Sequence, residues 1–413
     1  MRIAAPFSDK ARRAIDLRKD WSAGLETALE AAPPGKRLML HAPSVGEFLQ
    51  GRAVIDELME DRPDFVAVVT HFSPSAENIV GAYERAVART ILPLDFPDEV
   101  RRLLDIVRPD ILVFSRADVW PNLAREAHNR GVATMLVAGT FPPNAGRLIP
   151  LVSGTASAGL KALDLVAVIS EDDATRFVKL GVDEERIEIT GDPRFDQTWR
   201  RAMKVSDDDP LFSGLPHDGP TLVAGSTWPP DERVVVPAFA KVRGAVEQSR
   251  LIIAPHEPEP HRVSGIIESI RRQGLNAATL SEVESGAAGA PDAVVVDRVG
   301  VLAKLYRLGT AAFVGGSFVK KVHNVMEPAC MKLPVLVGPK HANAREAQLL
   351  VKSGGAFCVN NAQQMESKLL ELFSGGELRE RAGQAAENFI KANLGAVRRT
   401  AELMEKRFPA LFE

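Results

Sequence analysis

Short apolar runs alternate with amphipathic stretches along the first half of the chain. Each run is followed by turn residues, which is typical of strands buried on both faces of a parallel sheet. The runs span residues 37–42, 65–72, 88–94, 110–115, 133–139 and 165–170. Between them lie segments such as GEFLQGRAVIDELMED and DEVRRLLDIV, whose apolar residues recur at helical spacing. The pattern predicts repeated β-α units that build a parallel sheet covered by helices on both faces.

The alternation of apolar runs and amphipathic stretches is interrupted near residues 193–220, where the segment DDDPLFSGLPHDGP is typical of a linker. A second series of apolar runs follows, at residues 221–226, 250–256, 293–297, 311–316, 334–339 and 356–359, and residues 363–408 have helical patterns. We therefore predict an α/β protein with two Rossmann-like, doubly wound parallel-sheet domains, residues 1–205 and 206–413, with the last helix free to cross back to the first domain. Ligands of such sheets bind beyond the carboxyl ends of the strands, so the predicted site is a cleft between the domains.

The composition narrows the class of protein. Of 413 residues, 45% are hydrophobic and 25% are charged, which is normal for a packed globular protein. The formal net charge of −3 does not indicate general binding to nucleic acid. Two cysteines without metal-ligand spacing favour a reduced, cytoplasmic setting. The sequence shows no secretory signal and no apolar run of the ~18 residues that a membrane-spanning helix needs.

The N-terminal segment is basic and polar. Such a segment is most often a solvated, partly helical end. The alternative is a basic foot on an anionic membrane, where each cation contributes about 1 kcal/mol. The cations are Arg2, Lys10, Arg12, Arg13, Arg18 and Lys19.

The turn after the first apolar run, HAPSVGEF, holds polar residues where a ligand of a parallel sheet would bind. Ser44 and Glu47 have the spacing of a capping box, with Gly46 between them in the first helical turn. A carboxylate at the start of a helix is stabilised by the helix dipole, by about 0.3–1 kcal/mol. The alternative is that Glu47 is a general base at the mouth of the cleft. The spacing alone favours the capping box.

Two further strand ends in the first half carry polar residues. In FSPSAENI, Ser73 and Ser75 flank a proline that opens a helix. They either cap that helix or surround backbone N–H groups that bind an anion. In FSRADVWPN, Arg116 and Asp118 either form an exposed ion pair or line the cleft.

The second half repeats this arrangement. Ser226 and Thr227 end a strand in AGSTWPPDE, whose small residues allow close approach of a phosphate or sugar. The segment is not a P-loop, and the chain has no G-x-G-x-x-G fingerprint. His256 follows the next strand, in APHEPEPH, without H-E-x-x-H spacing, so a solvated loop is more common there than a metal site.

Residues 313–339 are richest in candidate residues. A Gly-Gly-Ser turn ends a strand, and a His-Asn pair precedes a short helix that carries a glutamate. An asparagine cap and an exposed glutamate would explain each residue alone, whereas a carboxylate just inside a helix can accept two hydrogen bonds from a ribose diol. The combination favours a ligand site formed by Gly315, Gly316, Ser317, His323, Asn324 and Glu327.

Together these motifs resemble the family of 3-deoxy-D-manno-octulosonic acid (Kdo) transferases, which add Kdo to the lipid A precursor. The resemblance extends from about residue 37 to residue 360, and the shared order and spacing of the motifs carry it. The motifs are HAPSVGEF, FSPSAENI, LPLDFP, RPDILVFSRADVWPN, GDPRFD, VAGSTWPPDE, LIIAPHEPEP, FVGGSFVKKVHNVMEP and PVLVGPKHANAREA. The resemblance implies a GT-B fold, in which the first domain binds the acceptor and the second binds CMP-Kdo.

The resemblance also implies roles for residues. Glu47 is the expected catalytic base of an inverting glycosyl transfer in lipopolysaccharide core biosynthesis, with no metal and no cofactor beyond the CMP-Kdo substrate. The expected acceptor site comprises Ser44, Gly46, Ser73, Ser75, Arg116 and Asp118. The expected donor site comprises Ser226, Thr227, His256, Gly315, Gly316, Ser317, His323, Asn324 and Glu327.

The acceptor is a lipid, so we expect the protein to associate with the anionic inner-membrane surface. It would attach peripherally at the cytoplasmic face, through its basic N-terminus and apolar residues such as Phe48 and Leu49. The expected partners are CMP-Kdo, a lipid A precursor and this membrane surface, with no nucleic acid.

Three departures from the family pattern leave alternatives open. Arg116 replaces an acidic residue of the E-x-E-x-W-P-N motif, and Pro255, His256 and Glu257 stand where many members have P-R-H. The two glycines of G-G-H-N are replaced by Lys321 and Val322. The alternatives are a GT-B enzyme that uses another nucleotide sugar or acceptor, and a non-catalytic binding module.

Overall fold

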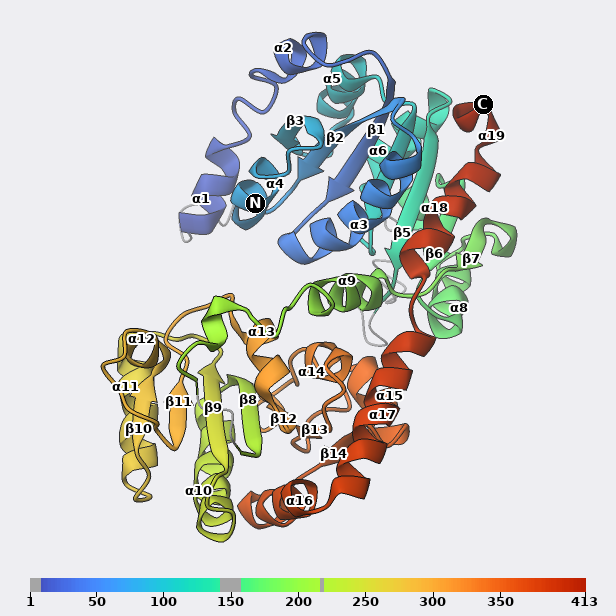
Figure 1. Cartoon of the computed structure of the whole chain (residues 1–413). Helices are drawn as coiled ribbons and strands as arrows, with labels where there is room; N and C mark the ends of the chain where they lie inside the picture. Colours follow the sequence, from blue (N-terminus) through green and yellow to red (C-terminus); the bar gives the residue numbers. More distant parts are fainter. Residues whose placement is uncertain (1–8, 142–156, 216–218) are drawn as a thin grey trace. The chain divides into compact units, whose positions relative to one another are not determined.

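The computed structural model describes residues 9–141, 157–215 and 219–413. Contacts within the chain divide it into two compact units (Figure 1). The first unit comprises Met1–Gln197 and Leu394–Glu413, and the second comprises Thr198–Asn393. The division falls shortly before the expected boundary at 205/206, and the last residues of the chain belong to the first unit.

The first unit contains a parallel sheet whose strands are β1 (Lys36–Ala42), β2 (Phe65–His71), β3 (Ala86–Ile91), β4 (Ile111–Ser115), β5 (Ala133–Gly139), β6 (Leu165–Val168) and β7 (Ile187–Ile189). The order of the seven strands is β3-β2-β1-β4-β5-β6-β7. The order reverses between β1 and β4. In doubly wound sheets, ligands bind beyond the carboxyl ends of the strands at this reversal.

Two apolar cores lie on the two faces of this sheet. Met39 belongs to one core, and its neighbours Leu38 and Leu40 belong to the other, as expected for the alternating side chains of a strand. The covering helices are α1 (Asp9–Asp16), α2 (Leu25–Glu30), α3 (Val45–Asp61), α4 (Glu77–Gly81), α5 (Pro97–Val107), α6 (Pro121–Asn129), α8 (Glu171–Lys179), α18 (Ala396–Arg407) and α19 (Pro409–Phe412). A further helix, α9 (Pro193–Ala202), runs across the division between the units.

The C-terminal segment completes the core of the first unit. α18 packs against α3, and Met404 is buried in the core beneath that helix (Figure 1). Phe412 stacks on Phe65, with 5.1 Å between the ring centroids. Asp196 fastens the returning chain, because its carboxylate accepts a hydrogen bond of 2.7 Å from the backbone N–H of Gly395.

The second unit contains another parallel sheet, of β8 (Thr221–Thr227), β9 (Arg250–Pro255), β10 (Ala277–Thr279), β11 (Ala293–Val295), β12 (Ala311–Val314), β13 (Val335–Val337) and β14 (Ala356–Cys358). The order of these seven strands is β10-β11-β9-β8-β12-β13-β14. Its helices are α10 (Pro229–Ala245), α11 (Pro260–Arg271), α12 (Leu280–Glu284), α13 (Leu302–Leu305), α14 (Met326–Cys330), α15 (Arg345–Lys352), α16 (Ala362–Ser374) and α17 (Gly376–Ala392). The reversal of strand order falls between β8 and β12.

Every apolar run that was predicted as a strand overlaps one, and the two doubly wound parallel sheets are confirmed. The sequence pattern did not reveal β7 and β10, which are the outermost strands of the two sheets at one end. Both are short, and β7 is mostly solvent-facing. The expected cleft between the domains stays a prediction.

Arg18 was expected to be part of a basic foot, and this prediction is wrong. The side chain is buried, and its guanidinium donates to three backbone carbonyls, including those of Leu92 and Phe72 at 2.8 Å each. Burial lowers the pKa of Arg18 to about 10, which leaves the group charged at neutral pH. Arg18 therefore pins the N-terminal segment to the carboxyl edge of the first sheet.

Phe48 was expected to contact a membrane, and this prediction is also wrong. The ring is fully buried and lies edge-on to Tyr83 at 5.6 Å, while Leu49 is half-buried against the same core. Arg2 and the side chain of Lys10 lie outside the described residues. Within the described parts of the chain, no helix combines the length and the apolarity needed to cross a membrane.

Candidate active site

Glu47 lies in the first turn of α3, just after the carboxyl end of β1. The chain enters the helix from Ser44, whose backbone is extended (φ −139°, ψ 173°) and whose side chain makes no capping hydrogen bond. The expected capping box is therefore wrong. The Glu47 carboxylate instead lies 3.4 Å from the Arg116 guanidinium, between Oε1 and Nη1. A charged partner from a distant segment replaces the local cap because it offers a charge-assisted hydrogen bond.

The end of β4 holds Arg116 beside Glu47. The backbone N–H of Arg116 donates to Val137 in β5 (2.8 Å), and the hydroxyl of Ser115 donates to the carbonyl of Glu47 (2.7 Å). Arg116 has a φ of 73°, which residues other than glycine adopt rarely and mostly at functional sites. The Glu47 side chain is 18% exposed and that of Arg116 41%. The pair therefore presents a carboxylate and a guanidinium to solvent at one place.

The second predicted loop of the acceptor site lies beside the first. The backbone N–H of Ser73 donates to the carbonyl of Pro43 (2.8 Å), and the hydroxyls of Ser73 and Ser75 are 2.7 Å apart. Ser73 accepts from the N–H of Ser75 (3.4 Å) and so caps the 3-10 helix Pro74–Ala76, which confirms the capping interpretation. A Cβ at Gly46 would meet nothing closer than 4.0 Å, so packing does not require glycine there. The acceptor contacts of all these residues stay predictions.

His41 is a buried polar residue of β1 that the sequence interpretation left without a role. Its Nδ1 lies 3.0 Å from the hydroxyl of Thr70, and its Nε2 has no hydrogen-bond partner among the described residues. Burial lowers the pKa of His41 to about 4, against the opposing charge of Asp118. Trp120 lies edge-on to the imidazole at 6.3 Å. His41 is therefore neutral at physiological pH, and Asp118 lies close enough to influence it.

In the second unit, the turn after β12 approaches the end of β8 so closely that only glycine fits. A Cβ at Gly315 would lie 2.3 Å from the carbonyl oxygen of Ser226, which itself has a left-handed φ of 54°. A Cβ at Gly316 would lie 2.2 Å from the carbonyl oxygen of Lys321, and its φ is 84°. The predicted residues Ser226, Gly315 and Gly316 are thus brought together at the carboxyl edge of the second sheet.

Asp231, which the sequence interpretation missed, fastens this turn to the start of α10. Its buried carboxylate accepts hydrogen bonds from the backbone N–H groups of Trp228 (2.9 Å), Gly316 (2.8 Å) and Phe318 (3.1 Å). Burial raises the pKa of Asp231, and these three hydrogen bonds oppose the shift. Residues 229–230 are prolines without N–H groups. Most backbone N–H groups that could bind an anion here are therefore absent or already occupied.

The imidazoles of His256 and His323 are brought together with the indole of Trp228. The two imidazoles stack with 4.3 Å between centroids and 23° between planes, and the indole stacks on His256 at 4.9 Å. The indole N–H also donates to Nε2 of His323 (3.0 Å). Burial lowers the pKa of His323 to about 4, with smaller contributions from His256 and Lys321. Two predicted donor residues and one missed residue form a single aromatic cluster.

The hydroxyls of Thr227 and Ser317 support the framework of the site. Thr227 is buried and donates to the Glu232 carboxylate (3.2 Å). Ser317 is fully buried, donates to the carbonyl of Val314 (3.1 Å) and accepts from the N–H of Gly338 (2.7 Å). Their expected contacts with the donor stay predictions, and these side chains already have partners inside the protein.

Asn324 and Glu327 stand at the start of α14. Asn324 caps the turn, since its side-chain oxygen accepts from the N–H of Met326 (3.0 Å). Burial raises the pKa of Glu327, and the charge of Arg201, at 3.8 Å, opposes the shift. Glu327 adjoins a cavity of about 190 Å³, within the second unit, whose lining is Thr198, Arg201, Ala202, Lys204, Val205, Gly300, Ala303, Lys304 and Glu327. No group of three or more His, Cys, Asp or Glu side chains suited to a metal ion occurs in the described parts of the chain.

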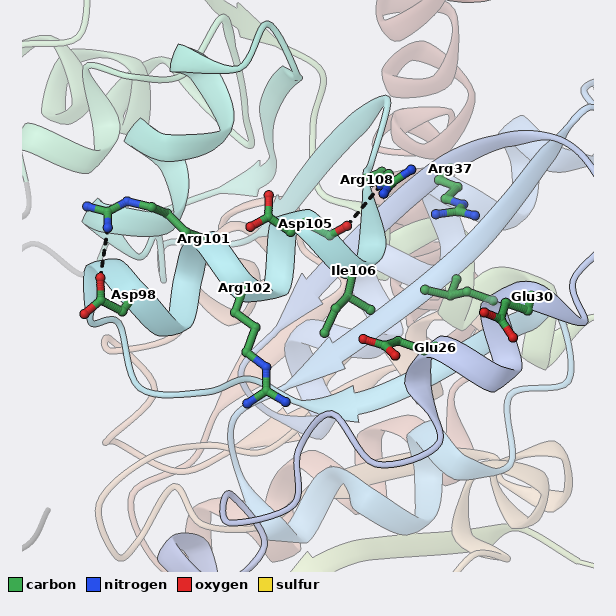
Figure 2. Close-up of a pocket in the computed structure, with 10 residues that line it drawn as sticks. Glu26, Glu30, Arg37, Asp98, Arg101, Arg102, Asp105, Ile106 and Arg108 are labelled. Atoms are coloured by element: carbon green, nitrogen blue, oxygen red, sulfur yellow. Dashed lines mark hydrogen bonds and ion pairs between the residues drawn. The ribbon is translucent and has the colours of Figure 1, made fainter.

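A separate cavity of about 680 Å³ lies between α2 and α5 of the first unit (Figure 2). It is lined by Glu26, Leu29, Glu30, Arg37, Asp98, Arg101, Arg102, Asp105, Ile106 and Arg108. Arg37 belongs to the amino end of β1, whereas Glu47 follows its carboxyl end. The charged side chains that line this cavity include both acidic and basic residues, and none of the lining residues is a predicted site residue.

Comparison with known proteins adds relatives of defined activity. Residues 19–197 match the family model described as 3-Deoxy-D-manno-octulosonic-acid transferase (kdotransferase). The chain is 25% identical over 380 residues to the 3-deoxy-D-manno-octulosonic acid transferase of Haemophilus influenzae, covering 91% of this chain and 88% of that protein. It is 26% identical over 397 residues to the enzyme of that name from Chlamydia pneumoniae, covering 91% and 86%. For the one from Aquifex aeolicus the identity is 27% over 340 residues, covering 82% and 86%.

Solved structures share the architecture of the chain. The glycosyltransferase from Rickettsia africae superposes with a TM-score of 0.60 at 12% identity, covering 91% of this chain and 99% of that one. The UDP-GlcNAc 2-epimerase from Neisseria meningitidis, bound to UDP-GlcNAc, gives a TM-score of 0.63 at 12% identity, covering 90% and 100%. At these identities the likeness shows the fold alone. The GT-B fold class that was expected from the sequence is confirmed.

Proposed function

Because residues 19–197 match the Kdo transferase family model and the chain is 25% and 26% identical to two Kdo transferases over most of its length, we propose that it belongs to this family and transfers Kdo from CMP-Kdo to a lipid A precursor. The observation that carries the proposal is the gathering of His256 and His323 with the Gly315 turn at the carboxyl edge of the second sheet. A partly buried carboxylate, Glu47, stands at the carboxyl edge of the first sheet. The residues at the second sheet would bind the nucleotide, and Glu47 at the first sheet would act as the base.

The reaction is an inverting displacement at the anomeric carbon of Kdo. Glu47 takes the proton of an acceptor hydroxyl as the hydroxyl oxygen attacks that carbon. The new carbon–oxygen bond forms while the bond to the phosphate oxygen of CMP breaks, and CMP leaves as an anion. Arg116, which pairs with Glu47 before the acceptor arrives, can transfer its hydrogen bond to an anionic group of the acceptor.

The donor site meets the charge of the leaving CMP mainly with side chains. Most backbone N–H groups near the Gly315 turn are occupied, so the imidazoles of His256 and His323 are the available donors. The Glu327 carboxylate at the start of α14 accepts hydrogen bonds from the hydroxyls of the ribose. The proposed step uses no metal ion and no cofactor other than the donor substrate.

The proposal is tested by incubating the purified protein with a lipid A precursor and CMP-Kdo generated in the assay. We expect Kdo-bearing product by mass spectrometry, and we expect the rate to persist in EDTA. Parallel reactions with UDP-GlcNAc are the donor control. Product from the UDP-sugar alone would overturn the choice of donor, and acceptor binding without product from any donor would favour a binding module.

We further propose that the protein works at the cytoplasmic face of the inner membrane through peripheral contact. Arg13 of α1 supports this, because its side chain is 63% exposed although it pairs with Glu77 at 3.2 Å. The exposed Ile79 on α4 follows that glutamate by two positions. A basic and apolar surface of this kind binds anionic lipids.

Sedimentation with phosphatidylglycerol vesicles tests the membrane contact. At low salt the wild-type protein should sediment with the vesicles, and Arg13→Glu should weaken the partition by about thirtyfold, since reversing one interfacial charge changes the binding free energy by about 2 kcal/mol. Arg381→Glu, an exposed change in the second unit, is the matched control. Equal sedimentation of wild type and Arg13→Glu would contradict the contact.

A further inference from the structure

The hydrogen bond between Trp228 and His323 fixes the position of a proton. The indole N–H can only donate, so Nε2 of His323, 3.0 Å away, must accept through its lone pair. A neutral imidazole whose Nε2 accepts carries its proton on Nδ1. The geometry therefore selects one of the two neutral tautomers of His323.

The orientation of the imidazole is fixed as well. The backbone N–H of His323 donates to the carbonyl of Gly315 (3.0 Å). A Cβ at Gly316 would lie 2.9 Å from Cδ2 of the ring, so the ring packs directly on that glycine. His256 covers one face of the ring at 4.3 Å. The ring therefore has little room to flip and present Nε2 instead of Nδ1.

We propose that Trp228 is a positioning residue that holds His323 as a neutral Nδ1–H donor for the phosphate of the nucleotide donor. Its indole selects the tautomer by hydrogen bonding and steadies His256 by stacking. The phosphate as the ligand rests on the proposed function. The tautomer of His323 rests only on the geometry within the second unit.

The charged and titratable groups around His323 agree with a neutral ring. His256 and Lys321 both disfavour the protonated form, and burial is the largest cause that lowers the pKa of His323 to about 4. The nearby carboxylate of Asp231 is occupied by three backbone N–H groups. The hydrogen bond from Trp228 also requires an unprotonated Nε2, so its loss should raise the pKa of His323.

The test replaces Trp228 with phenylalanine, which keeps an aromatic ring and removes the N–H. Trp199→Phe, in the same unit, is the matched control. Nitrogen NMR of histidine-labelled protein reports the tautomer of His323, and calorimetry with CMP at pH 7.5 and pH 5.5 reports binding. Each variant is compared with wild type at the same pH, because the phosphate of CMP itself titrates in this range.

We expect the wild type and Trp199→Phe to show the Nδ1–H tautomer, and Trp228→Phe to show a mixture of both. We expect Trp228→Phe to bind CMP about fivefold to tenfold more weakly at pH 7.5, the effect of one neutral hydrogen bond. The loss of CMP affinity in Trp228→Phe should be smaller at pH 5.5, because His323 then becomes protonated and its positive charge attracts the phosphate. A purely structural role of the indole would give the same loss at both pH values.

If Trp228→Phe folds poorly, the tautomer of His323 in the wild-type protein still tests the proposal, because a ring protonated on Nε2 would overturn it. A second variant asks whether His323 is the group that titrates. His323→Asn offers an amide donor near the position of Nδ1 and cannot titrate. The double variant Trp228→Phe/His323→Asn should bind CMP more weakly than the wild type by a factor that does not change between pH 7.5 and pH 5.5. An unchanged Nδ1–H tautomer in Trp228→Phe, or a loss independent of pH, would overturn the role of Trp228. Absence of CMP binding by the wild type would overturn the phosphate as ligand and, with it, the proposed donor site.

Discussion

Replacing Glu47 with glutamine is expected to lower kcat for Kdo transfer by about 10²–10⁴-fold, the usual contribution of general-base catalysis. Glutamine has nearly the same size and keeps a hydrogen-bond acceptor for Arg116, but its amide cannot take a proton from the acceptor hydroxyl. CMP binding should stay unchanged, because the donor residues belong to the second unit. Steady-state kinetics with the lipid A precursor and calorimetry with CMP measure the two effects.

Glu60→Gln is the matched control for this prediction. Glu60 lies on the same helix, is solvent-exposed and pairs with Arg85 only at 3.8 Å. Its replacement should leave kcat within about twofold of wild type, as expected for a surface substitution. Wild-type turnover in Glu47→Gln would remove Glu47 from the role of base. The next residue to test would be Asp118, the other carboxylate of the predicted acceptor site.

Replacing Asp231 with asparagine is expected to lower the free energy of unfolding of the second unit by about 2–5 kcal/mol. The carboxylate accepts hydrogen bonds from three backbone N–H groups, whereas the NH2 group of an asparagine would face at least one of them and its carbonyl oxygen carries no charge. Each buried N–H left without a partner costs about 1–3 kcal/mol. Because the turn after β12 would be held by fewer hydrogen bonds, none of them to a charged group, CMP binding should weaken along with stability. Urea unfolding and calorimetry measure both effects.

Asp208→Asn, an exposed change in the same unit, is the control for the loss of a negative charge. It should unfold within about 0.5 kcal/mol of wild type, as surface substitutions usually do. An Asp231→Asn protein that unfolds like Asp208→Asn would show that the carboxylate does not hold the donor loop.

Strands with a continuous apolar run can be predicted from the sequence, whereas the edge strands β7 and β10 lack such a run and cannot. A central strand such as β2 must be apolar on both sides, and its continuous run FVAVVTH reveals it. β7 has a glutamate between two isoleucines and is largely exposed, so nothing in its composition marks it as a strand. Its pairing with β6 depends on a neighbour that is distant in the sequence.

The candidate site shows the same limit at the level of side chains. Ser44 and Glu47 have the spacing of a capping box, but the Glu47 carboxylate pairs with Arg116, which is distant in the sequence. The spacing within one segment does not reveal this pair, because Arg116 reaches Glu47 only through the pairing of β4 with β1. Trp228 and Asp231 stand within the quoted segment AGSTWPPDE, yet their contacts to His323 and Gly316 depend on the turn after β12. A tryptophan placed directly after a strand was the available signal.

The return of residues 394–413 to the first unit reverses the order in which the two units can be completed during translation. The second unit lies wholly within residues 198–393, so all of its residues are synthesised before residues 394–413 of the first unit. The core of the first unit still lacks Met404 and Phe412 at that moment. The domain whose synthesis begins first is therefore the last to close, and a nascent chain released a few residues early would keep an intact second unit beside an unfinished first one.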